Sequence, residues 1–122
     1  LLAASAAAAP ARPATAPTDG ANRGDAIRKL FDPSGAVRVR AYGALLPLYA
    51  NDSTLVPEVL AVAREHPRNA NGIYNALVVL SHMNAASLRP HRAEIVAFAE
   101  EAQRMGPRVA ERARTLIRRV PS

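Results

Sequence analysis

The chain of 122 residues is 49% hydrophobic, carries a formal net charge of +6 and has no cysteine, which excludes disulfides, thiol catalysis and cysteine-ligated metal sites. No stretch approaches the roughly 20 consecutive apolar residues that a membrane-spanning helix needs, so no membrane span is predicted. The positive charge favours acidic proteins or polyanions as partners.

The first 23 residues differ in composition from the rest of the chain. They are mostly Ala, Pro and Thr and lack periodic large apolar residues, so they cannot bury enough surface to offset the entropy lost on ordering. We therefore predict a tail at 1–23 and one folded domain at 24–122. The run LLAASAAAAP is similar to the end of a secretory signal, which predicts a periplasmic or secreted protein. The alternative is a linker within a larger, cytoplasmic, multidomain chain, and the sequence leaves both readings open.

Helical signals begin at Asp25, which is expected to be the N-cap of a short leading helix that ends at Pro33. The next helix is predicted over 36–49, where apolar residues at 37, 41, 44, 45 and 48 have the spacing of an amphipathic stripe. Pro47 removes the hydrogen bond to the carbonyl of Gly43, so this helix is expected to kink or stop there.

The remaining helices follow from apolar spacing and from turn residues. They are predicted over 54–65, over 70–83, over about 89–105 and, after the Gly106-Pro107 break, over 107–120. The only alternating segment is VRVR at 37–40, and it continues directly into a helical stripe. The sequence therefore predicts an all-α fold of about five main helices and a short leading helix.

Parts of this sequence repeat. AYGALLPL at 41–48 matches IYNALVVL at 73–80, and the same apolar spacing returns at 113, 116, 117 and 120. Between these helices, EVLAVA at 58–63 matches EIVAFA at 94–99. Periods of 30 to 40 residues built from paired helices are typical of an α-solenoid, in which each pair buries its apolar face against its neighbours. The helix at 70–83 would then lie between units, so Leu77 is expected to be among the most buried side chains.

The segment DPSGAVRVRAYGAL resembles a HEAT repeat of the bacterial, HEAT-like kind. The resemblance rests on Asp32, Val37-Arg38, Ala41, Ala44 and Leu45, and on Pro47, which is similar to the proline kink of that family's first helix. It implies a short HEAT-like (armadillo-type) α-solenoid of about two and a half helix pairs, in a bacterial protein. The resemblance also implies that the second helices, 54–65 and 89–105, line the concave groove, and that the protein is a scaffold or binds other proteins.

No catalytic or metal-binding constellation is apparent, and no cofactor is expected. The chain has no nucleophile elbow and no glycine-rich phosphate loop. The possible acid, base or ligand residues do not converge in the sequence: they are His66, His82, His91, Glu94, Glu100 and Glu101. His82 is expected to be a buried, hydrogen-bonded ring. We therefore predict that the protein is not an enzyme.

Two sets of charged residues are candidate binding surfaces. The first lies on the second helices, which are nearly balanced in charge, and is expected to engage a protein partner; it comprises Arg64, Arg89, Arg92, Glu101 and Arg104. The second lies on the last helix, where five arginines face one glutamate, and is expected to bind nucleic acid weakly and without sequence preference; it comprises Arg108, Arg112, Arg114, Arg118 and Arg119. The predicted function is a non-catalytic interaction or scaffold module. The alternative is a HEAT-like module that binds nucleic acid or another polyanion.

Two polar positions of the repeats have more than one interpretation. Tyr42 and Tyr74 occupy equivalent places beside the apolar stripe, so they either pack between units or share a ligand-facing surface. Asn75, in an otherwise apolar helix, is expected to form a buried hydrogen bond across units.

Overall fold

The computed structural model describes residues 20–122, and this part of the chain contains helices and no strand. The helices are α1 (Gly20–Lys29), α2 (Gly35–Tyr49), α3 (Leu55–Glu65), α4 (Ala70–Ser81), the short α5 (Ala85–Leu88), α6 (Arg92–Ala102) and α7 (Pro107–Arg119). A 3-10 turn at Arg89–His91 precedes α6, and another at Gln103–Met105 follows it. The predicted all-α fold is confirmed. None of the helices within 20–122 has the length and apolar character needed to cross a membrane.

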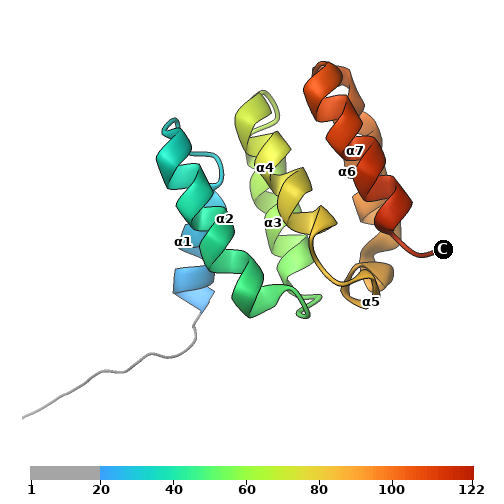
Figure 1. Cartoon of the computed structure of the whole chain (residues 1–122), viewed down its shortest axis with the longest axis horizontal. Coiled ribbons are helices and arrows are strands. Elements are labelled where there is room, and N and C mark those ends of the chain that lie inside the picture. The colour runs from blue at the N-terminus through green and yellow to red at the C-terminus, as the bar shows by residue number, and fades with distance from the viewer. Residues whose placement is uncertain (1–19) are drawn as a thin grey trace, which may run out of the picture.

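The helices form two layers. Helices α2, α4 and α7 lie side by side in one layer, with α1, α3 and α6 behind them (Figure 1). Each helix of the first layer packs against the helix that precedes it, which gives the pairs α1/α2, α3/α4 and α6/α7. The sequence instead placed the first pair at 36–65 and left the last helix without a partner. That pairing was wrong because α1 is a full partner of α2.

Side chains at the helix starts determine most of the element boundaries. The Ser34 hydroxyl accepts a hydrogen bond from the Val37 amide at 3.4 Å, and the Asn69 side chain accepts one from the Gly72 amide at 2.9 Å. Gly106 has φ of 105°, a backbone conformation that favours glycine, and Pro107 then begins α7. Asp25 was expected to be a cap, but it lies inside α1 and pairs with Lys29 at 3.0 Å.

Helix α4 lies at the centre of the core. Five apolar side chains along it are buried, and Leu77 is fully buried, as predicted. Helix α2 differs because only Ala41 and Leu45 are buried along its length. Leu48 was expected in the stripe but is 69% exposed, because α2 lies at the end of its layer and no other helix among residues 20–122 covers its outer side (Figure 1). The helix also continues through Pro47 to Tyr49 rather than stopping there.

The leading helix is held to α3 by Arg23, a residue that the sequence analysis placed in the tail. Its guanidinium donates hydrogen bonds to both Glu58 carboxylate oxygens, to Asp52 Oδ2 at 3.2 Å and to Thr54 Oγ1 at 3.1 Å. It also lies over the Tyr49 ring, with Cζ 5.2 Å from the centroid. The Arg23 side chain is only 14% exposed. The predicted boundary after residue 23 therefore falls within α1, and residues 1–19 lie outside the described part of the chain.

These interactions change the protonation equilibria of two groups. The hydrogen bond with Glu58 raises the pKa of Arg23, so the guanidinium stays charged. Hydrogen bonds from Thr54, together with the charge of Arg23, lower the pKa of Asp52 below its usual value of 3.8. The cluster at the start of α3 is thus stabilised in its ionised form.

The first and second helical pairs also meet at their loops. The Phe31 ring stacks on the His66 ring at a centroid distance of 5.3 Å, and Asn69 Nδ2 donates to the Phe31 carbonyl at 2.9 Å. Phe31 lies so close to Gly72 that a Cβ built on this glycine would be 2.0 Å from Phe31 Cδ2. Only glycine fits at this contact.

Candidate functional site

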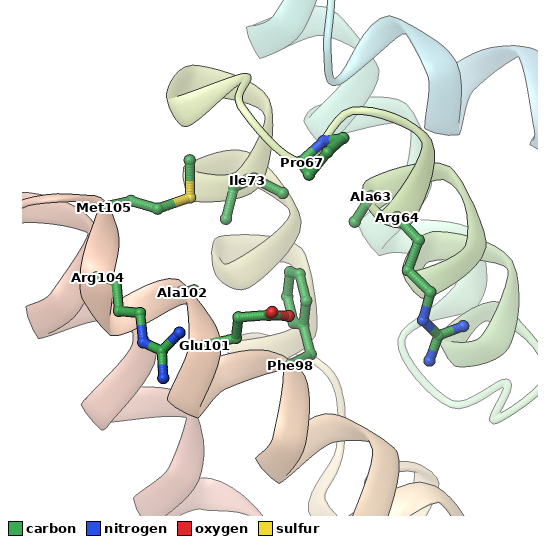
Figure 2. A pocket seen from close by; sticks show the side chains of 9 residues that line it. All are labelled: Ala63, Arg64, Pro67, Ile73, Phe98, Glu101, Ala102, Arg104 and Met105. Carbon is green, nitrogen blue, oxygen red and sulfur yellow. The ribbon is translucent and has the colours of Figure 1, made fainter.

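A groove runs between α3 and α6, the two helices of the rear layer that make few direct contacts with each other. Its upper part is a cavity of about 270 Å³. Figure 2 shows its lining residues, which are Ala63 and Arg64 of α3, Pro67, Ile73 of α4, Phe98, Glu101 and Ala102 of α6, and Arg104 and Met105. A neighbouring hollow of about 380 Å³ is lined by Arg64, Ala93, Glu94, Ala97, Phe98 and Glu101. The two hollows share Arg64, Phe98 and Glu101 and therefore lie next to each other, and we refer to them together as the α3/α6 groove.

Small side chains on the facing helices make this space. Ala63 and Ala102 are buried on α3 and α6, but neither is large enough to fill the gap between the helices. The floor is Ile73, which α4 contributes from the other layer. Phe98 and Met105 are partly buried, and the Phe98 ring extends into the gap (Figure 2). Because Ala63, Ile73 and Ala102 are buried, the apolar surface that a ligand can reach in the groove is that of Phe98 and Met105.

Three charged residues surround the apolar floor, and the sequence analysis had selected all three. Arg64 and Arg104 lie on opposite sides of the groove, and the Glu101 carboxylate points toward Phe98 between them (Figure 2). All three residues are exposed. Within residues 20–122, none of them forms an ion pair. Their charges are thus available to a partner.

The other two residues of the first predicted set lie outside the groove. Arg89 is in the 3-10 turn before α6, and Arg92 is the first residue of that helix; neither lines the groove. Phe98 was expected to point inward but is only half-buried, since no side chain of α3 fills the space opposite it. The sequence did not indicate that the apolar residues of the site face a ligand. The spacing of apolar residues shows which side of α3 and α6 is apolar, but not that a gap separates the two helices.

The arginines of α7 do not form one continuous surface. Arg108 lies over the Tyr74 ring of α4, with Cζ 3.7 Å from the centroid, and Arg112 lies near the same ring at 5.8 Å. Arg119 donates to the Met83 carbonyl, and Arg118 Nη2 donates to Thr115 Oγ1 at 3.3 Å. Arg108, Arg112 and Arg119 therefore lie along the side of α7 that faces α4. Arg114 and Arg118, by their helical spacing, lie on another side.

The remaining candidates for chemistry are dispersed. Among residues 20–122, no three His, Asp or Glu side chains come together in a way that could hold a metal ion. His82 was expected to be buried, but it is exposed at the end of α4 and bonds through Nδ1 to the Val78 carbonyl at 2.9 Å. Asn75 was expected to bond across units, but its Nδ2 donates to the Asn71 carbonyl of its own helix at 2.8 Å.

Comparison with known proteins finds no matching family model, no similar curated protein and no similar solved structure.

Proposed function

We propose that the protein is a non-catalytic interaction module, a short HEAT-like α-solenoid that binds a protein partner in the groove between α3 and α6. The observation that carries this proposal is the groove itself, where the partly exposed side chains of Phe98 and Met105 lie over a buried apolar floor and are surrounded by three charged side chains without ion pairs among residues 20–122. An apolar centre surrounded by charged and polar side chains is the arrangement found in protein–protein interfaces.

The charges of the groove favour a protein over a nucleic acid. A groove that follows a phosphate backbone needs positive charge along its length and aromatic rings on which bases stack. Here Glu101 lies in the centre of the groove and Glu94 lines its lower part, so phosphates would be repelled at both places. Phe98 is the only aromatic ring of the lining.

The occupant that fits this groove is an amphipathic helix. The two connected hollows accommodate two apolar side chains of a ligand, and residues three or four apart on a helix supply such a pair. Arg64 and Arg104 require acidic side chains on the partner, and Glu101 requires a basic one. The partner helix thus carries two apolar anchors flanked by charges of both signs.

A selection from a display library of amphipathic helices tests this function. We expect the selection to enrich peptides with paired apolar anchors and acidic flanks, whose Kd is then measured by fluorescence polarisation. Phe98→Ala should weaken binding at least about tenfold, because it removes a desolvated anchor contact. The matched control is Leu48→Ala, which removes an exposed apolar side chain of α2 and should leave the Kd unchanged.

Two outcomes would contradict the proposal. One is that no peptide is enriched above the unselected library. The other is that the enriched peptides bind the Phe98→Ala and Leu48→Ala variants equally well, since the apolar floor would then play no part in binding.

Helix α7 supports a second candidate function, weak binding of polyanions. The observation in its favour is that α7 carries five arginines, four of them exposed, and a single glutamate. We expect duplex DNA to bind without sequence preference and to dissociate steeply as salt rises. Submicromolar affinity at about 150 mM salt, lost on charge reversal at Arg64 and Arg104 but not at Arg118 and Arg119, would instead assign nucleic acid to the groove.

A further inference from the structure

Tyr74 of α4 and two arginines of α7 form a second, smaller hollow on the other layer of the molecule. It has a volume of about 270 Å³ and is lined by Tyr74, Arg108, Glu111, Arg112 and Thr115. Two guanidinium groups thus lie near one aromatic ring, at 3.7 and 5.8 Å from its centroid. We propose that this hollow binds a single phosphate monoester group, and this inference is independent of the α3/α6 groove.

The stacking on Tyr74 orients the arginine donors. A Cζ distance of 3.7 Å is about the contact distance of stacked planar groups, so the ring face is occupied by the guanidinium of Arg108. The N–H groups of a guanidinium lie in its plane and therefore point sideways, away from the ring. The contact with Tyr74 therefore restrains the guanidinium of Arg108 and leaves its donors available to an oxyanion.

These donors have no acceptor within residues 20–122. Neither Arg108 nor Arg112 forms an ion pair or a hydrogen bond there, although Glu111 lines the same hollow. Arg118 and Arg119 of the same helix are both hydrogen-bonded, and Arg114 lies on another side of the helix. Two like charges near one ring repel each other, and an anion bound between them removes this repulsion.

The arrangement favours a phosphate monoester over other anions. Two planar forks require more acceptor oxygens and more negative charge than one carboxylate supplies, and a monoester has three terminal oxygens and close to two charges at neutral pH. Glu111 lines the same hollow, and its negative charge opposes the binding of a chain of phosphates more than that of a single phosphate group. The hollow is therefore expected to discriminate between a single phosphate and a polyanion.

Titration of the 15N-labelled chain with O-phosphoserine, with inorganic phosphate and with acetate tests this site. We expect the Arg108 and Arg112 Nε–H resonances to shift saturably with both phosphates, and acetate to bind at least about tenfold more weakly. Tighter binding of phosphoserine than of inorganic phosphate identifies an ester attached to a larger molecule as the ligand. Equal or weaker binding of phosphoserine would contradict the monoester and assign free phosphate to the hollow.

Two double variants separate a built site from diffuse charge. Arg108→Lys with Arg112→Lys keeps the charge but removes the planar forks, and should weaken phosphate binding at least about tenfold. Arg114→Gln with Arg89→Gln removes two charges at exposed residues that do not line the hollow, and should change the Kd less than about twofold. The proposal is refuted if the lysine variant binds as wild type, if the glutamine variant loses as much affinity, or if no saturable shift occurs.

Discussion

Replacing Gly72 with alanine should destabilise the fold through a single contact between the first two helical pairs. The added Cβ would lie 2.0 Å from Phe31 Cδ2 and 2.6 Å from Phe31 Cγ. Cγ lies on the axis of the Cβ–Cγ bond, so a turn of the ring about that bond does not relieve the overlap with this atom. Phe31 is only 6% exposed and stacks on His66, so the ring has little space into which it could move.

The magnitude follows from two opposing terms. Overpacking of a filled core costs about 1 to 3 kcal/mol, and the severity of this overlap favours the upper end. Alanine in place of glycine within a helix recovers at most about 1 kcal/mol. The net effect is a destabilisation of about 1 to 2 kcal/mol, which corresponds to a decrease in Tm of roughly 4 to 16 °C for a domain of this size.

Urea denaturation followed by circular dichroism at 222 nm measures this effect. A double-mutant cycle with Phe31→Ala provides the control, because removal of the ring removes the overlap. In the Phe31→Ala background, Gly72→Ala should therefore be neutral or stabilising. If Gly72→Ala alone leaves the wild-type stability unchanged or raises it, the packing described for these two loops is wrong.

Three further changes test the core and the ion-pair cluster. Leu77→Ala should cost about 2 to 5 kcal/mol of unfolding free energy because Leu77 is fully buried, and a cost below about 0.5 kcal/mol in urea denaturation would place α4 at the periphery. Arg23→Ala should lower the unfolding free energy by about 1 to 2 kcal/mol. Lys29→Ala breaks an exposed ion pair and should lower it by less than about 0.5 kcal/mol. Equal costs would show that Arg23 does not hold α1 in place. A carboxyl whose pKa is lowered by folding stabilises the fold above its unfolded pKa, and this contribution is lost as the pH falls through the folded pKa. Asp52→Asn should therefore lower Tm at pH 7, with a difference from wild type that shrinks as the pH falls below about 4; a difference that is constant with pH would contradict the shift of the Asp52 pKa.

Periodicity and turn residues predicted most of the helices because those signals are local. The stripe on 73, 76, 77 and 80 is fully buried, as expected for a helix with neighbours on both sides. The same stripe on α2 predicted Leu48 wrongly, because periodicity shows which face is apolar but not whether another helix covers it. The start of α1 was missed for a related reason, since residues 20–23 have no apolar pattern and Arg23 holds them through contacts with residues 29 to 35 positions away.

Which helices pack as a pair depends on the length of the connection between them. A single residue, Gly106, separates the end of the second 3-10 turn from α7, and so short a connection places α6 and α7 against each other. This signal could have given the observed pairs. The sequence did indicate Arg64, Glu101 and Arg104, because they are charged residues on segments that the sequence predicted to be the second helices of the repeats. It could not indicate the groove, which exists because Ala63 and Ala102 leave space between helices that are distant in the chain.

Mapping of a selected helical peptide onto the 15N-labelled chain tests the central claim, that the α3/α6 groove is the binding surface. We predict that the largest amide shift changes fall on 63–67 and 98–105, with only small changes along α2 and α7. A selected peptide whose shift changes instead concentrate on the exposed side of α2, or on the arginine-rich α7, would show that the groove is not where this protein binds its partner.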